Sequence, residues 1–193
     1  MNTRNILLTS LLAGALGLAA LTLSPLAIKS ASAHECPPDA VSCFVEGRMT
    51  GGGRIDTSNI RWPPVPGTIV THGFELHCNA AELPNGFQVN WNGIADVGSN
   101  RFHLETLEDV LCWDDPNISP TPPNAPFDTL SAHGYGRYNG QSGAYLFIKL
   151  TDAGEPGRYD EATIVVYDKF GILQLDVTGK LKYGNHQAHK ATG

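Results

Sequence analysis

The chain has 193 residues, with 13 lysine and arginine side chains against 19 aspartate and glutamate side chains, a net charge of −6. An acidic chain without a basic cluster is unsuited to the phosphate backbone of DNA or RNA, so nucleic acid is not expected as a partner. The length suits one ordinary domain with a sizeable hydrophobic core.

The N-terminal segment has the pattern of a secretory signal peptide. Arg4 precedes a stretch rich in Leu and Ala from Ile6 to Ile28, and Ala31-Ser32-Ala33 offers small residues for a signal peptidase. The alternative is an uncleaved membrane anchor, but Ser24 and Pro25 interrupt the apolar stretch. We therefore expect a signal peptide over 1–33 and one secreted domain over 34–193, extracellular or periplasmic.

Cleavage after Ala33 removes Arg4 and Lys29, which leaves 11 basic and 19 acidic side chains, a net charge of −8. After cleavage no second long apolar run remains that would span a membrane. All four cysteines lie in the expected mature chain, where an even number favours disulfide bonds. Of the three pairings we prefer Cys36–Cys43 with Cys78–Cys112, and the absence of a C-x-x-C motif disfavours a zinc site.

Apolar and polar residues alternate in the mature chain, the period of a half-buried strand, and no segment has convincing helical periodicity. The strands expected from this alternation are 74–78, 87–92, 102–105, 146–150 and 173–177, and the β-branched run 162–167 is expected as a strand covered on both faces. Turn sequences separate them, namely Asn85-Gly86, Asn139-Gly140 and the hairpin loop 168–171. Short strands with regular turns predict an all-β fold, an antiparallel β-sandwich or, as the alternative, a flattened β-barrel.

Two proline-rich segments, 62–67 and 114–127, cannot form central strands and are expected as long loops. We interpret the second as a crossover between two sheets, although a long ordered loop can also be functional. The segment 184–193 is polar and is expected to be a frayed tail.

Several motifs in order resemble the post-COAP-type domain of bacterial secreted proteins. They are Met49–Ile55, Thr71–Phe74, Leu76–Cys78, Asn90-Trp91, Arg101–Leu104, Cys112 before Asp115-Pro116, Thr151–Gly157 before Asp160, and Gly184–Gln187. The resemblance covers roughly residues 44–187. It implies a β-rich extracellular module that opens with a short strand, a Thr-Gly-Gly-Gly turn and a return strand. It supplies no catalytic residues.

The acidic segment 152–161 joins two expected strands and holds four carboxylates on a glycine-containing loop. Calcium binds several oxygen ligands at flexible distances, so Asp152, Glu155 and Asp160 are candidate calcium ligands. The alternative is a solvated hairpin in which Asp and Gly serve the turn. Calcium is the leading cofactor candidate in the sequence, and no cofactor is required by it.

Histidines suggest a second metal hypothesis. Cleavage after Ala33 would expose His34 as the N-terminus, whose amine and imidazole could hold copper as in the histidine brace of lytic polysaccharide monooxygenases. A brace needs a second histidine, and the candidates are His72, His77, His103 and His133. His77 and His103 fall at outward positions on neighbouring expected strands, where a cross-strand pair is one interpretation and surface histidines without a role are the favoured one. His186 and His189 are expected in the polar tail.

A carbohydrate-binding face is the main alternative to a plain interaction module. Glu75, Gln88, Asn90, Asn92 and His103 are expected on one polar sheet face, with Phe87 and Trp91 on the buried face. Trp62 and Trp113 lie in or beside the proline-rich segments, where they either stack on sugar or pin the loops.

Nucleophilic catalysis has no support, because the chain lacks a G-x-S-x-G motif and its cysteines suit disulfides. We therefore expect a secreted, non-enzymatic interaction or structural module of the cell envelope or extracellular space, with a protein or glycan partner. The alternatives are a carbohydrate-binding module and, third, a copper-dependent polysaccharide oxidase that uses His34.

Overall fold

A computed structural model describes residues 45–92, 98–118 and 125–191 of the chain. It contains eight strands and a single 3-10 turn, η1 (Gly157–Tyr159). The strands are β1 (Gly47–Ile55), β2 (Val70–His77), β3 (Gly86–Asn92), β4 (Ser99–Trp113), β5 (Thr129–Tyr138), β6 (Gln141–Thr151), β7 (Glu161–Tyr167) and β8 (Leu173–Lys190). No helix within these residues is long and apolar enough to cross a membrane.

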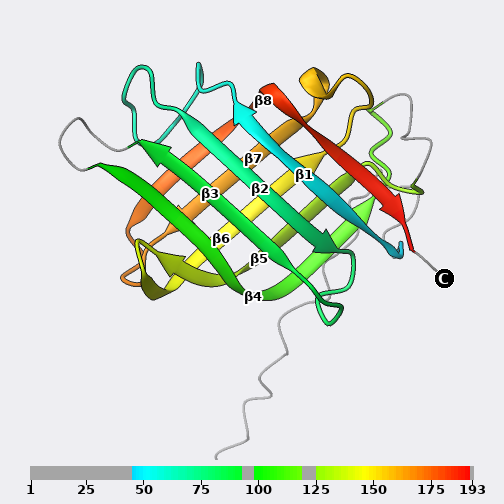
Figure 1. Cartoon of the computed structure of the whole chain (residues 1–193), viewed down its shortest axis with the longest axis horizontal. Coiled ribbons are helices and arrows are strands. Elements are labelled where there is room, and N and C mark those ends of the chain that lie inside the picture. The colour runs from blue at the N-terminus through cyan, green and yellow to red at the C-terminus, as the bar shows by residue number, and fades with distance from the viewer. Residues whose placement is uncertain (1–44, 93–97, 119–124, 192–193) are drawn as a thin grey trace, which may run out of the picture. The chain divides into compact units, whose positions relative to one another are not determined.

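The eight strands form a closed antiparallel barrel in chain order (Figure 1). Each strand pairs with the next along the chain, and β1 pairs with β8 to close the sheet. The predicted all-β antiparallel fold is therefore confirmed in its alternative form, the barrel, and the two-sheet sandwich is wrong. Closure removes the exposed sheet edges that an open sheet would have to protect.

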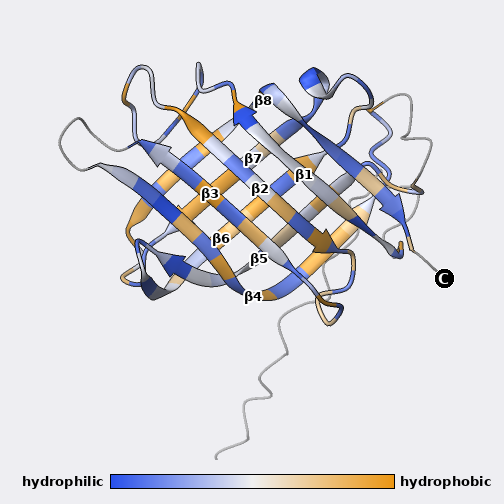
Figure 2. Ribbon diagram, viewed as in Figure 1, coloured by the Kyte–Doolittle hydropathy of each residue, from blue (hydrophilic) through white to orange (hydrophobic). Residues whose placement is uncertain are grey.

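Alternation along each strand places apolar side chains inside the barrel and polar ones outside, as the bands of colour in Figure 2 show. In β2, for example, Val70, Phe74 and Leu76 are buried, while Thr71 is exposed and Glu75 is partly so. Side chains from all eight strands join one core cluster, which includes Phe87, Trp91 and Phe102. An eight-stranded barrel is just wide enough to be filled in this way.

The proline-rich segment after β4 is not a crossover between sheets. β4 and β5, the strands on either side of it, are direct antiparallel neighbours, paired from Phe102–Tyr138 to Trp113–Thr129. The interpretation of segment 114–127 as a crossover between two sheets is therefore wrong. Residues 119–124 of this segment lie outside the described part.

The segment expected as a frayed tail is a strand. β8 continues to Lys190, and residues 181–190 pair with β1. The resemblance also implied a turn at Thr50–Gly53, but β1 is continuous through these residues. Glycines allow a very close approach here, because a Cβ on Gly184, whose φ is +110°, would lie 2.1 Å from the carbonyl oxygen of Gly52.

A disulfide joins Cys78, just after β2, to Cys112 near the end of β4, as predicted. The β2–β3 pairing ends at Glu75–Gly86 and the β3–β4 pairing at Gln88–His103, so the bond joins β2 to β4 beyond the end of β3, where the two Cα atoms are 5.6 Å apart. The proposed Cys36–Cys43 bond lies outside the described residues.

Two of the predicted turns have the expected geometry. Asn139 has a φ of +48° and Gly140 a φ of +82°, which suits a tight hairpin between β5 and β6. In the loop between β7 and β8, Asp168 Oδ1 accepts hydrogen bonds from the backbone N–H groups of Phe170 and Ile172. These bonds lower the pKa of the Asp168 carboxyl.

Candidate functional site

The acidic segment predicted to bind calcium is arranged around β8. Residues 186–188 of β8 lie beyond the end of β7, since the β7–β8 pairing ends at Glu161–Lys180. Asp160 Oδ2 accepts a hydrogen bond from the His186 N–H at 2.7 Å, and Asp152 Oδ2 accepts one from the Ala188 N–H at 2.8 Å. The two carboxylates therefore accept the hydrogen bonds of buried backbone N–H groups that have no neighbouring strand on this side.

The second oxygen of each aspartate and one oxygen of Glu155 also have donors. Asp160 Oδ1 accepts from the Ala153 N–H, Asp152 Oδ1 accepts from the Gly154 N–H, and Glu155 Oε1 accepts from the Asn185 side-chain amide. Burial raises the pKa of Asp160 to about 7, against the lowering effect of its two N–H donors.

Within the described part of the chain, no group of three His, Cys, Asp or Glu residues is placed to hold a metal ion. Calcium at Asp152, Glu155 and Asp160 stays a prediction.

Two histidines lie inside the barrel and contact each other. His72 of β2 and His186 of β8 are buried, with their Nε2 atoms 2.8 Å apart, and Phe74 packs against both rings. His186 was expected in a polar tail, and this expectation is wrong because β8 turns its side chain into the core.

The hydrogen bonds define the protonation of this pair. His186 Nδ1 lies 2.9 Å from the Thr151 carbonyl oxygen, which can only accept, so Nδ1 carries the proton and Nε2 of the neutral ring accepts. His72 then donates from its Nε2. Burial lowers the pKa of His72 to about 3 and that of His186 to about 4, so both rings are neutral near pH 7.

The other histidines do not form the predicted arrangements. His77 and His103 are not a cross-strand pair, because β3 separates β2 from β4 and the strand neighbours of His103 are Gln88 and Arg137. His189 also lies in β8, where its Nε2 is 2.9 Å from the Thr50 hydroxyl. His34, on which the copper hypothesis depends, lies outside the described residues.

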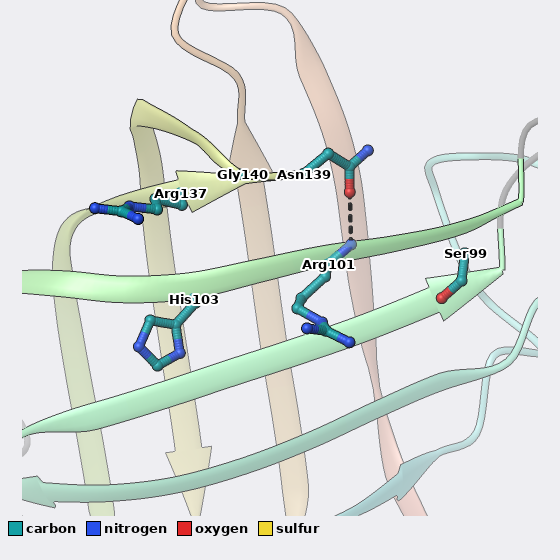
Figure 3. A pocket seen from close by; sticks show the side chains of 6 residues that line it. All are labelled: Ser99, Arg101, His103, Arg137, Asn139 and Gly140. Atoms are coloured by element: carbon teal, nitrogen blue, oxygen red, sulfur yellow. Dashed lines mark hydrogen bonds between the residues drawn. The ribbon is translucent and has the colours of Figure 1, made fainter.

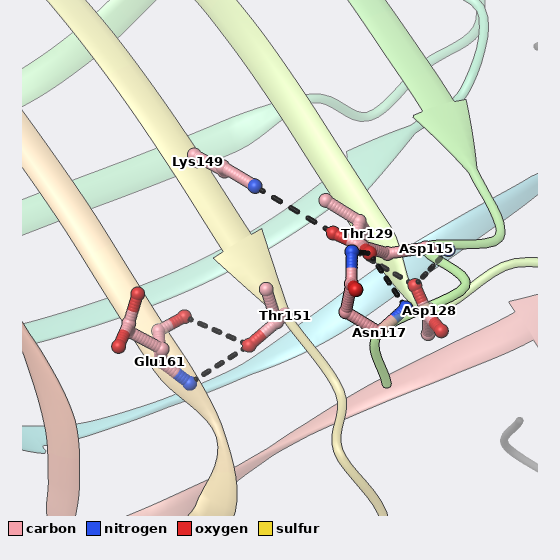
Figure 4. A network of polar contacts seen from close by, with 7 residues as sticks. All are labelled: Asp115, Asn117, Asp128, Thr129, Lys149, Thr151 and Glu161. Atoms are coloured by element: carbon pink, nitrogen blue, oxygen red, sulfur yellow. Dashed lines mark hydrogen bonds and ion pairs between the residues drawn. The ribbon is translucent and has the colours of Figure 1, made fainter. Parts of the chain in front are cut away.

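A polar network joins the start of β5 to the loop after β4 (Figure 4). Asp128 Oδ1 accepts hydrogen bonds from the Asp115 N–H and from the Thr129 hydroxyl, while Lys149 lies 3.8 Å from an Asp115 carboxylate oxygen. Burial raises the pKa of Asp128 to about 6, and its Oδ2 has no hydrogen-bond partner among the described residues. The network fixes the ends of the loop against the barrel.

The outer wall has a hollow of about 420 Å³ over β4 and β5, lined by Ser99, Arg101, His103, Arg137, Asn139 and Gly140. Arg101 and His103 project from the same side of β4, and His103 is level with Arg137 on β5 (Figure 3). We call this feature the cationic hollow. Sequence reasoning placed His103 on a polar face but missed the two arginines, which come together only because β4 pairs with β5.

Each arginine of the cationic hollow uses its Nε atom to bond a neighbour. Arg101 Nε donates to Asn90 Oδ1 at 3.2 Å, and Arg137 Nε donates to Glu105 Oε1 at 2.5 Å. Among the described residues Arg101 has no carboxylate partner. The terminal guanidinium nitrogens can therefore serve an anionic group that enters the hollow.

A row of three tyrosines continues the outer wall from the cationic hollow. Tyr135 of β5, Tyr145 of β6 and Tyr167 of β7 are direct cross-strand neighbours. Their ring centroids are 5.5 Å and 6.4 Å apart, and the rings are inclined at 67° and 47° to each other. We call this the tyrosine row. Tyr135 is two residues from Arg137 on the same face of β5, so the hollow and the row adjoin.

The two tryptophans considered for sugar binding differ in their exposure to solvent. Trp113 is buried at the end of β4, with the Lys149 ammonium 5.4 Å from its ring centroid. Trp62 is 41% exposed and pairs with Asp176 through a single β-bridge. Because Trp113 is buried, it is not available to stack on a sugar ring. The prediction that Phe87 and Trp91 face the interior is confirmed.

Comparison of the chain with protein-family models, curated proteins and solved structures finds no match. The resemblance to the post-COAP-type domain stays a prediction. The function has to be inferred from the protein's own residues.

Proposed function

We propose that this protein is an extracellular, non-enzymatic binding module that holds its ligand on the outer wall of the barrel. The observation that carries the proposal is the cationic hollow, which lies on the outer wall while apolar side chains fill the interior. Lipocalin-type barrels bind ligands inside, but here large buried residues from every strand occupy that space.

The hollow favours a ligand with anionic groups. Arg101 and Arg137 provide positive charge and hydrogen-bond donors, and of these two only Arg137 is paired with a carboxylate among the described residues. A guanidinium group binds carboxylate, sulfate or phosphate through two parallel hydrogen bonds. Ser99 adds a hydroxyl at the rim.

A binding array that carries neutral glycans, acidic glycans and acidic peptides tests this proposal. We expect the purified protein to retain anionic ligands, and the double variant R101A/R137A to lose them. R48A is the matched control, since Arg48 is an exposed arginine of β1 that pairs with Glu75. An equal loss in R48A, or retention unaffected by R101A/R137A, would contradict the proposal.

Export of the protein is part of the proposal and has its own test. The signal-peptide pattern and the Cys78–Cys112 disulfide support it, because disulfides persist in oxidising compartments. We expect the mass of the exported protein to correspond to a chain that begins at His34 and has no free thiol. A mass that includes residues 1–33 would contradict export by cleavage.

Carbohydrate is the ligand class that a second observation favours. Aromatic side chains are a recurrent platform for the apolar faces of sugar rings, and the tyrosine row places three of them on neighbouring strands.

A further inference from the structure

We propose that the cationic hollow and the tyrosine row form one continuous site for an acidic polysaccharide. This inference rests on the proposed function and specifies its ligand. The sugar rings pack over Tyr135, Tyr145 and Tyr167, and their carboxylate or sulfate groups are held by Arg101 and Arg137.

The register of the strands makes the site continuous. His103 of β4 is level with Arg137 of β5, Tyr135 follows two residues away on the same face, and Tyr145 and Tyr167 continue the path across β6 and β7. The path crosses three interstrand steps of about 4.8 Å each. That length suits a short stretch of an extended chain rather than a single small anion.

The exposure of the three tyrosine rings is compatible with packing against sugar rings. Tyr135 is 47% exposed, and Tyr145 and Tyr167 are half-buried, so each keeps part of its ring available while its neighbours hold it in place. The rings contact one another edge-on or tilted rather than lying in one plane. Because neighbouring strands of a barrel are rotated relative to each other, such a row suits a twisted polymer better than a flat crystalline surface.

The net charge of the protein argues against a nucleic acid as the polymer that binds the outer wall. A nucleic acid has a charge density that needs many basic contacts, which a chain of net charge −6 does not offer. Unsulfated acidic polysaccharides such as polygalacturonate, alginate and hyaluronate have one charge or fewer per sugar ring, so two arginines beside a row of aromatic rings match their alternation of charge and apolar surface. An acidic peptide would use the arginines without needing the row.

Calorimetric titration tests the inference, with a panel of polygalacturonate, alginate and hyaluronate oligomers, the methyl-esterified form of polygalacturonate, and polyglutamate. We expect at least one acidic oligomer to bind, more weakly at higher salt, and esterification to abolish binding. Y145A and Y167A should each lower the affinity by about five- to tenfold, and Y145F should retain most of it. Y183A is the matched control, because Tyr183 is a 71% exposed tyrosine of β8 outside the row.

The outcomes separate this inference from the proposed function. If R101A/R137A abolishes binding while Y145A and Y167A do not change it, the ligand uses the hollow alone and the inference is wrong. Tighter binding of polyglutamate than of every acidic oligomer, unchanged in Y145A, would assign the hollow to a peptide and also overturn the inference. Binding to none of the acidic oligomers contradicts the inference, whereas the proposed function fails only if no array ligand depends on the arginines. Thermal melts of every variant confirm that the barrel is folded.

Discussion

At two positions of β8 a carboxylate, rather than a neighbouring strand, bonds a buried backbone N–H group. Asp152 serves Ala188 and Asp160 serves His186, so residues that read as calcium ligands in the sequence also hold the sheet together. The sequence signal is the same for both roles, because metal ions and N–H groups both require carboxylate oxygens. Only the strand register reveals which donors lie beside them.

The variant D152A tests this structural role. It leaves the buried Ala188 N–H without an acceptor, so we expect the free energy of unfolding in urea to fall by about 1–3 kcal/mol. Hydrogen exchange of the Ala188 amide should accelerate as well. E155A is the control from the same acidic segment, since Glu155 bonds only the side-chain amides of Asn185 and Gln187 and should change stability by less than about 0.5 kcal/mol. A larger loss in E155A would argue for a role of the three acids other than strand support.

The interior histidines and Asp160 make stability depend on pH in opposite directions. The unfolded histidines take up protons below their ordinary pKa of 6.5, whereas the folded pair resists protonation until about pH 3 to 4, so stability falls as the pH drops below 6.5. Asp160 ionises near pH 7 when folded but near 3.8 when unfolded, so its contribution is present at low pH and is lost as the pH rises toward 7.

Two variants separate these contributions in urea unfolding measured between about pH 4.5 and 6. H72F removes one proton taken up by the unfolded chain, so we expect the slope of stability against pH to decrease by about 1.4 kcal/mol per pH unit. D160N should shift the slope by a similar amount in the positive direction. Slopes identical to the wild type in both variants would show that neither group has a shifted pKa.

At the scale of the elements, the close contact of β1 with β8 depends on glycine. Gly184 combines a φ of +110° with a position where a Cβ would meet the Gly52 carbonyl oxygen. We expect G184A to lower the free energy of unfolding by more than about 2 kcal/mol, from backbone strain and the displaced strand together. G171A is the matched control, since Gly171 has a φ of +77° and nothing within 4 Å of the added Cβ, and should cost about 1 kcal/mol. Equal losses would mean that the close contact contributes nothing.

Strands with a regular two-residue period could be predicted from the sequence, and strands with interruptions could not. The alternation at 74–78, 87–92 and 146–150 corresponds to parts of β2, β3 and β6, and the β-branched run 162–167 to most of β7, which is fully buried on one face only. β4 extends to Trp113, but bulges near Glu105 and Glu108 shift its period. β5 was missed because Gly134 and Gly136 occupy interior positions where an apolar side chain would give the signal.

At the scale of the whole molecule, closure of the sheet was the property that local sequence could not decide. The β1–β8 pairing joins residues at opposite ends of the described chain, and its signal lies in glycines and in the segment 184–190, which reads as a polar tail. A sandwich and a barrel share the same strand alternation. The long-range pairing, not the pattern, distinguishes them.

The candidate site, like the closure of the barrel, depends on strand pairing that the local sequence does not reveal. His103 could be assigned to an outer polar face from alternation alone, but Arg101, Arg137 and the tyrosine row adjoin only through the order and register of β4 to β7. The barrel thereby separates two tasks. Its interior provides stability, and its outer wall is free to provide recognition.

Amide chemical-shift mapping by NMR, during titration with the acidic oligomer that binds most tightly, tests this separation most directly. We predict that the shifts concentrate on the outer-wall residues Arg101, His103, Arg137 and Tyr145, while interior residues such as Leu146 and His72 change little. Shifts centred on the interior residues, with the outer wall unaffected, would contradict the account.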